Sequence, residues 1–115
     1  MNFKEQVKEF DSMKYFIGAD LGTSALKLLL VDGDNNVVKT VSKSYEVFYP
    51  NPGWSDQNPK DWWEAFVSGV NELTGDIDKS LISGIAVAGQ MHGLVALDAE
   101  DNIISPAILW NDGRT

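Results

Sequence analysis

The chain has 115 residues, of which 43% are hydrophobic, and a formal net charge of -8 at pH 7. This length fits one domain with a buried core, and the negative charge disfavours general binding to nucleic acid or to anionic lipid. Because the chain has no cysteine, a disulfide framework and a thiolate metal site are both excluded.

Residues 1–14 are charged and lack the apolar core of a signal peptide, so we expect a cytoplasmic protein that does not bind a membrane. Phe3, Val7 and Phe10 could share one side of a short amphipathic helix. The alternative, which we favour, is a leader outside the fold, with Met13 as the true or older start. Residues 1–14 are therefore treated as an N-terminal extension.

Three strands joined by short links are predicted in the segment that follows. The stretches YFIGAD (15–20) and LKLLLVD (26–32) are apolar runs that indicate buried strands, and GDNN (33–36) is a strong turn signal. The stretch VVKTVSKSYEV (37–47) alternates and is rich in β-branched residues, which predicts a strand with one solvated face. Because the links are short, the three strands should form an antiparallel meander.

A loop that holds three of the four prolines, YPNPGWSDQNP (49–59), leads into a predicted helix. Asn58 is the expected N-cap, Pro59 takes the first helical position, and Asp61 lies in the first turn. Gly75 is the candidate C-terminal cap. The helix should run over residues 60–73 and bury one stripe, formed by Trp62, Phe66, Val70 and Leu73.

The last third of the chain reads as a strand and a hairpin. LISGIAVAG (81–89) is nearly continuously apolar, which is typical of a strand covered on both faces. LVALD (94–98) and ISPAILW (104–110) flank the turn residues AEDN and predict a hairpin. A helix between a meander and a buried strand suggests a crossover that sets the later strand parallel to the first. The order β-β-β-α-β plus hairpin therefore predicts an α/β fold with a mixed sheet.

The turn between the first two strands carries residue types that suit phosphate binding. Gly22 lets the backbone approach a ligand, successive N–H groups can form an anion nest, and Thr23 and Ser24 add hydroxyl donors. Asp20 cannot bind phosphate directly, because like charges repel, but it can hold Mg²⁺ that bridges to phosphate oxygens, and Lys27 could add one cation. The alternative is an ordinary hairpin, in which these residue types are common.

Further polar residues follow the last long strand. Gln90, Met91 and His92 lie between two glycines, at a strand end of the kind where ligands bind in open α/β sheets. For His92, the only histidine, a functional and a structural role are equally open.

The closing segment combines a tryptophan with an amide, a carboxylate and a guanidinium, which suits a polyol. The ring face could contact C–H groups, and the polar tips could bind hydroxyls. The alternative is a strand end followed by a solvated loop. The residues concerned are Trp110, Asn111, Asp112 and Arg114.

Four segments together resemble the N-terminal part of the FGGY family of carbohydrate kinases: IGADLGTSALKLLLVD, PGWSDQNPKDWW, GIAVAGQMHGLVALD and PAILWNDGRT. The combination of GQMHG with ILWNDGR is specific for the branch that acts on xylulose. The resemblance implies an incomplete N-terminal lobe of the ribonuclease-H-like fold found in actin- and hexokinase-type ATPases. It also implies phosphorylation of D-xylulose to D-xylulose 5-phosphate, with ATP and Mg²⁺ as cofactors.

The resemblance also implies a role for each candidate residue. Asp20 would stand at the Mg²⁺ position of the family, and Met91 and His92 would match its substrate-binding pair. We therefore expect Asp20 and this pair to face one cavity. The loop that faces the terminal phosphates would consist of Gly22, Thr23 and Ser24. The residues that line or support the sugar pocket would be Gln90, Trp110, Asn111 and Asp112.

The chain departs from the family in what it lacks. The general base of the family is an aspartate well downstream, and the adenine-binding lobe has no counterpart here. Residues 15–115 should thus be the first part of the N-terminal domain, in a fragment that is inactive alone. Its truncated sheet should leave strand edges unpaired and promote self-association. The alternatives are another kinase of the family, acting on ribulose, gluconate or glycerol, or a non-catalytic self-associating fragment.

Overall fold

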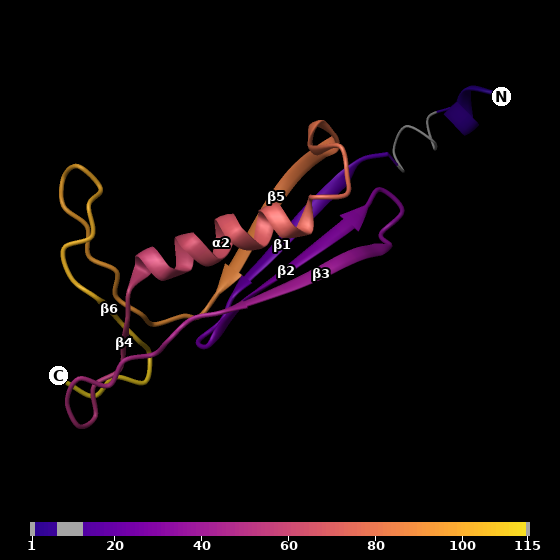
Figure 1. The fold of residues 1–115 in the computed structure, drawn as a ribbon. Helices are drawn as coiled ribbons and strands as arrows, with labels where there is room; N and C mark the ends of the chain where they lie inside the picture. Colours follow the sequence, from indigo (N-terminus) through magenta and orange to yellow (C-terminus); the bar gives the residue numbers. More distant parts are fainter. Residues whose placement is uncertain (1, 7–12, 115) are drawn as a thin grey trace.

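The computed structural model describes residues 2–6 and 13–114. Within these ranges, the main feature is a four-stranded sheet that a helix covers on one face (Figure 1). The sheet has the order β3-β2-β1-β5, with β1 at Tyr15–Leu21, β2 at Ala25–Asp32, β3 at Val37–Ser44 and β5 at Ile82–Gly89. The helix is α2 (Pro59–Leu73), and a short 3₁₀ helix, η1 (Lys79–Leu81), leads into β5.

The pairing of the strands confirms the predicted topology. β1 is antiparallel to β2, β2 is antiparallel to β3, and β1 is parallel to β5. In the predicted turn after β2, the Asp32 carboxylate accepts hydrogen bonds from the amides of Asp34 and Asn36, each at 2.9 Å. Because Leu21 pairs with Gly89, the crossover through α2 brings the end of β5 beside the β1–β2 turn.

The N-terminus of α2 forms as predicted. The Asn58 side chain accepts a hydrogen bond of 3.0 Å from the Lys60 amide, which would otherwise lack a partner inside the helix. Pro59 begins the helix, and Asp61 places its negative charge in the first turn. These local signals fix where the chain turns into the helix after the loop.

The C-terminus of α2 differs from the prediction. Thr74 is the C-cap, and its amide and hydroxyl donate to the Val70 carbonyl at 3.0 and 2.8 Å. The prediction that Gly75 caps the helix is therefore wrong. A threonine hydroxyl satisfies a terminal carbonyl directly, so no glycine in a left-handed conformation is needed.

The core lies between α2 and the sheet face that α2 covers. Phe66 and Val70 pack against it as predicted. A Cβ at Gly69 would lie 2.4 Å from Leu28 Cδ1, so glycine allows the helix to approach β2 closely. The buried residues of the core are Ile17, Ala19, Leu26, Leu28, Leu30, Val41, Ala65 and Leu73.

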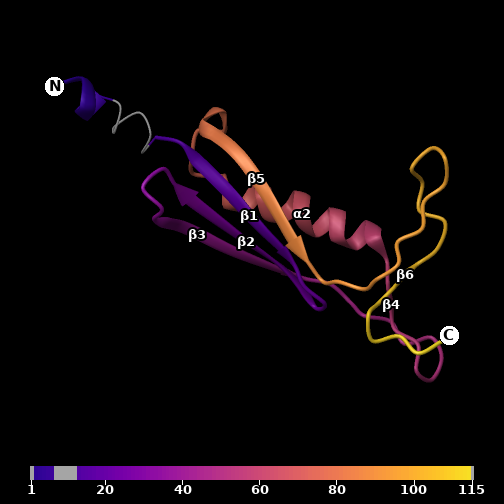
Figure 2. The same ribbon diagram turned by 180° about the vertical axis from the view of Figure 1, so that it is seen from behind.

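The opposite face of the sheet is open. Figure 2 shows the strands in front with α2 behind them. Ile85 and Val87 in β5 are 51% and 68% exposed, so the prediction that both faces of this strand are covered is wrong for the described residues. The reason is position, because among residues 2–6 and 13–114 β5 is an edge strand that pairs with β1 alone, and α2 packs mainly on β2 and β3. The predicted unpaired edge and uncovered apolar face are confirmed for the part of the chain that the structure describes.

Beyond the end of the main sheet, β4 (Asp56–Gln57) pairs with β6 (Ala107–Ile108) in antiparallel fashion. The sequence indicated only a loop at β4, so this short strand is a correction. The predicted hairpin over 94–110 forms only in part: its two arms are paired through single bridges, between Leu97 and Ile103 and between Leu94 and Ile108. It projects away from the main sheet (Figure 1).

The N-terminal segment is described only in part. Residues 3–6 are helical, and the predicted stripe continues at Val7 and Phe10, which lie outside the described residues. Of the helices in residues 2–6 and 13–114, none is both long enough and apolar enough to cross a lipid bilayer.

Candidate functional site

The β1–β2 turn is closed by its own backbone and by Tyr45. The Gly22 amide donates to the Ala25 carbonyl at 3.0 Å, and a Cβ at Gly22 would lie equally close to that oxygen, so the turn leaves little room for a side chain there. The Tyr45 hydroxyl donates to the Gly22 carbonyl, and the Tyr45 amide donates to the Ser24 carbonyl at 3.2 Å. No hydrogen bond in the described part of the chain engages the amides of Thr23 and Ser24. Of the three amides predicted for an anion nest, that of Gly22 is therefore occupied, and those of Thr23 and Ser24 are the two that remain.

Asp20 lies near the end of β1, on the open face of the sheet. It stands opposite Lys27 in β2 and Ala88 in β5, and all three line a hollow of about 560 Å³, called here the open-face hollow. Burial raises the pKa of Tyr45 to about 12, and the nearby Asp20 carboxylate adds to this increase. Tyr45 therefore stays protonated at neutral pH and keeps donating to the turn.

The surroundings of Asp20 leave its carboxylate available. The side chain is exposed, and the ion pairs among the described residues do not include it. Nowhere in residues 2–6 and 13–114 do three His, Cys, Asp or Glu side chains gather closely enough to hold a metal ion by themselves. A cation at Asp20 would thus need further ligands from a bound phosphate or from water.

Gln57 joins the turn to the other parts of the site. Its side chain is almost fully buried, with 1% of the residue exposed. Its Nε2 donates to the carbonyls of Thr23 and Glu46, at 2.5 and 3.3 Å. Its Oε1 accepts from Trp62 Nε1 at 3.1 Å and from Gln90 Nε2 at 3.2 Å. The amide thus connects the turn, the start of α2 and the end of β5.

Thr23 is the point at which three of the predicted site residues meet. Its hydroxyl donates to Gln90 Oε1 at 3.4 Å and accepts a hydrogen bond of 3.2 Å from Trp110 Nε1. The contacts span 67 and 87 positions of the sequence. The turn predicted to bind phosphate and the two segments predicted to bind sugar are therefore adjacent in the fold.

The Met91–His92 pair follows the end of β5. His92 has a φ of 60° and lines a hollow of about 270 Å³ with Gln90, Trp62 and Leu21, called here the His92 hollow. Trp62 was predicted to pack in the core stripe, but it is half-buried outside the core cluster and borders this hollow instead. Met91 is 73% exposed.

Asp20 and His92 line different hollows, so the described residues do not form the single cavity that was expected for them. Strand alternation explains the separation, because successive side chains of a strand point to opposite faces. Leu21 faces the His92 hollow, and the preceding Asp20 faces the open face. Thr23 lies just beyond the end of β1, and its hydrogen bond to Gln90 links it to the side of the sheet on which the His92 hollow lies.

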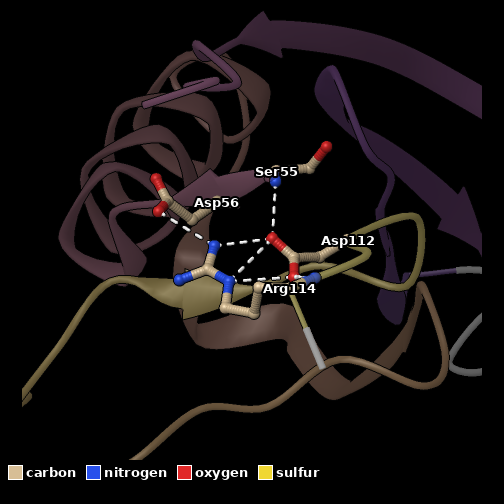
Figure 3. A network of polar contacts seen from close by, with 4 residues as sticks. All are labelled: Ser55, Asp56, Asp112 and Arg114. Carbon is tan, nitrogen blue, oxygen red and sulfur yellow. Dashed lines mark hydrogen bonds and ion pairs between the residues drawn. The ribbon is translucent and has the colours of Figure 1, made fainter. Parts of the chain in front are cut away.

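Asp112 is held in a polar network of its own (Figure 3). Its carboxylate, 2% exposed, accepts from the Ser55 amide and from the Arg114 guanidinium, with a shortest distance of 2.6 Å to each. Arg114 also reaches Asp56 at 3.3 Å and lies 4.0 Å above the Trp54 ring. Hydrogen bonds from Arg114 hold the pKa of Asp112 well below its usual range. The contacts of Asp112 and Arg114 therefore hold the closing segment against the loop before α2.

Asn111 lies apart from the other candidate residues. It lines a hollow with residues 49–55 and does not line the His92 hollow. Asn111 is exposed and directly precedes Asp112 in the chain.

Sequence reasoning missed Tyr45 and Gln57. Tyr45 was read as part of a strand, and Gln57 as a loop residue before the N-cap. No local pattern marks a glutamine as buried, because its partners Thr23, Trp62 and Gln90 come from three separate elements. The one available signal was the group of polar residues next to a helix start and a tryptophan.

Comparison with known proteins places these residues in a family context. A family model described as the N-terminal domain of the FGGY family of carbohydrate kinases matches residues 15–115. The xylulose kinase of Staphylococcus xylosus is 46% identical over 103 residues, which cover 90% of this chain and 21% of that protein. The chain thus spans about a fifth of the length of this curated relative.

Solved structures show the same fold. The crystal structure of a xyloylose kinase from Brucella ovis matches with a TM-score of 0.82 and 44% identity, over 87% of this chain and 22% of that one. The crystal structure of gluconate kinase from Lactobacillus acidophilus matches with a TM-score of 0.81 and 35% identity, over 86% of this chain and 20% of that one.

Proposed function

The chain belongs to the FGGY family of carbohydrate kinases, and from this membership we propose that it supplies the sugar pocket and the first phosphate loop of a D-xylulose kinase. The reaction would transfer a phosphoryl group from ATP to D-xylulose and give D-xylulose 5-phosphate. One observation carries the proposal: Thr23 in the β1–β2 turn is hydrogen-bonded to both Gln90 and Trp110, which supports a phosphate loop that lies directly beside a sugar pocket.

The fold is that of the family, whose members have the actin- and hexokinase-like ribonuclease-H fold, so the predicted fold class is confirmed. We propose residues 15–115 as the first part of the N-terminal domain, in line with the residues that the family model matches. Residues 1–14 would be an N-terminal extension to it.

On the phosphate side, the amides of Thr23 and Ser24 would bind the terminal phosphate oxygens of ATP, with the turn held in shape by Tyr45. Asp20 fits a Mg²⁺ position, because Mg²⁺ is commonly bound through one or two carboxylates, phosphate oxygens and water. Bound there, the ion would supply positive charge that stabilises the transferring phosphoryl group. Lys27, opposite Asp20, would add positive charge on the same face.

On the sugar side, the His92 hollow would receive the ketose. The imidazole of His92 can donate to one hydroxyl and accept from another. The N–H of Trp110 is already used by Thr23, so its ring face, in a residue that is 56% exposed, is what remains for sugar C–H groups. Met91 would close the hollow from the solvent side. Asp112 and Asn111 would support the segment that carries Trp110.

The fold alone does not select the substrate, since a gluconate kinase matches it almost as well as a xyloylose kinase does. The xylulose proposal is favoured by the curated relatives, which include the xylulose kinases of Staphylococcus xylosus and Bacillus subtilis at 46% and 45% identity. Ribulose, gluconate and glycerol remain the competing substrates.

Replacing His92 by alanine should weaken the use of sugar far more than the use of ATP. The test uses a chimera in which residues 15–115 replace the matching segment of the Staphylococcus xylosus xylulose kinase. The loss of one or two hydrogen bonds should raise the KM for D-xylulose by roughly 10-fold or more, with the KM for ATP within about twofold. Steady-state kinetics with each substrate varied in turn measures both values.

Ser105→Ala, at an exposed position of the projecting hairpin, is the matched control and should change neither KM. An equal loss for sugar and ATP would place His92 in a structural role and contradict the proposal.

The isolated chain should show no turnover, because the proton acceptor for the sugar hydroxyl is expected outside it.

The isolated chain should self-associate through β5. An exposed edge with Ile85 and Val87 at the surface can pair with the same edge of a second copy. Sedimentation velocity should show a sedimentation coefficient that rises with protein concentration, and Val87→Lys should reduce this rise. Val67→Lys, on the exposed side of α2, is the control and should not. A monomer at all concentrations would contradict the prediction.

A further inference from the structure

We propose that Gln57 is a positioning residue that couples the phosphate-side turn to the sugar-side segments, so that neither can move without the other. The proposal rests on the proposed function for its role in catalysis, but the coupling itself is a property of the folded chain. Gln57 touches neither of the candidate ligands directly. It acts through Thr23, Gln90 and Trp62, which it joins from one buried position.

The Gln57 amide is saturated with partners. A primary amide offers two N–H donors and two acceptor lone pairs. Here the donors point to the carbonyls of Thr23 and Glu46, and the lone pairs accept from Trp62 and Gln90. Turning the amide over would set its oxygen against two carbonyls and its NH₂ group against two donors. The orientation of Gln57 is therefore fixed by its surroundings.

This orientation sets the polarity of a closed path of hydrogen bonds. Because Gln57 Oε1 accepts from Gln90 Nε2, the Gln90 oxygen must face Thr23, and the Thr23 hydroxyl donates to it. The path returns to Gln57 through the Thr23 carbonyl. With its proton directed at Gln90, the Thr23 hydroxyl can only accept from Trp110. The phosphate side is thus left with the backbone amides and the Ser24 hydroxyl as donors, and not with the Thr23 hydroxyl.

The backbone holds Gln57 where this path needs it. Gln57 pairs with Ala107 across β4 and β6, and it immediately precedes the helix cap Asn58. Its main chain is thus bound on one side to the segment that leads to Trp110 and on the other to α2. A displacement of the sugar-side segment is transmitted through Gln57 to the Thr23 carbonyl, and so to the turn.

The coupling predicts a response at a residue that Gln57 does not touch. In the full 115-residue chain, Gln57→Met should speed solvent exchange of the Trp110 indole N–H by at least about tenfold and shift the Gln90 side-chain amide signals in ¹H–¹⁵N NMR spectra. The indole signal of Trp63, on the exposed side of α2, serves as an internal reference and should stay in place. Gln6→Met, the same substitution at an exposed position, is the control and should change none of these signals.

A second variant covers the case in which Gln57→Met does not fold. Trp62→Phe removes a single donor to Gln57 Oε1 and keeps an aromatic ring in place. It should move the Gln90 and Trp110 signals in the same direction by a smaller amount. Unchanged Trp110 and Gln90 signals in either folded variant would overturn the coupling. Since no sugar or nucleotide is present, this outcome is independent of whether the xylulose proposal holds.

Discussion

Replacing Asp20 by asparagine in the chimera should lower kcat with D-xylulose by roughly 10²–10³-fold. Asparagine keeps the shape of the side chain and removes the charge that would hold Mg²⁺ beside the transferring phosphoryl group. The side chain faces the open-face hollow and not the His92 hollow, so the KM for D-xylulose should stay within about twofold. Initial rates over a range of Mg²⁺ concentrations should also show a higher requirement for the ion in the variant.

Asp34→Asn is the matched control for this experiment. Asp34 is exposed in the turn after β2, at the opposite end of β2 from the turn at Thr23, and the same change of charge there should leave kcat unaltered. A kcat of Asp20→Asn within about threefold of the unmodified chimera would contradict the metal role of Asp20.

Replacing Asp112 by asparagine should lower the melting temperature of the chain at pH 7 by several degrees. The carboxylate accepts hydrogen bonds from the Ser55 amide and from Arg114, and an asparagine NH₂ group would face these donors with a donor of its own. The variant would also leave Arg114 with a weakened partner over the Trp54 ring. Thermal unfolding followed by circular dichroism measures the change.

The same network predicts a dependence on pH. The folded pKa of Asp112 is lowered, so the carboxylate stabilises the fold fully above the unfolded pKa of about 3.9. This contribution is lost as the pH falls from there through the folded pKa. The melting temperatures of the parent chain and of Asp112→Asn should therefore differ at pH 7 and converge in acid.

Other aspartates titrate in the same range, which makes a control necessary. The turn residues Asp32 and Asp98 also have lowered pKa values, because backbone amides donate to them. Their effect is common to parent and variant and cancels in the difference. Asp101→Asn, at a φ of 65° that asparagine tolerates, should have the same melting temperature as the parent chain at every pH. A difference between parent and Asp112→Asn that does not shrink in acid would contradict this role.

Local sequence signals predicted the longer elements of the fold but not their surroundings. The N-cap Asn58 and the following Pro59 determine where α2 begins, because both act through neighbouring backbone groups. The apolar pattern predicted β5 to within one residue, and the helical crossover predicted its parallel pairing with β1. Its faces are nevertheless open, since burial depends on which elements pack against it. The short pairing of β4 with β6 joins segments far apart in sequence, which no local pattern reports.

The residue types of the site were predictable, whereas the contacts between them were not. Thr23, Gln90 and Trp110 were all identified as candidates, and they do meet. Their link through Gln57 depends on a side chain that the sequence shows only as part of a polar loop. The separation of Asp20 from His92 could have been inferred, because strand alternation already directs Leu21 and Asp20 to opposite faces.

The sugar preference of the chimera is the most direct test of the function proposed for this chain. With residues 15–115 in place, we expect the chimera to phosphorylate D-xylulose with a kcat/KM well above those for glycerol, gluconate and ribulose, measured side by side at saturating ATP. A folded chimera that preferred glycerol or gluconate, or that bound ATP and phosphorylated no sugar, would contradict the assignment of the His92 hollow to a xylulose pocket.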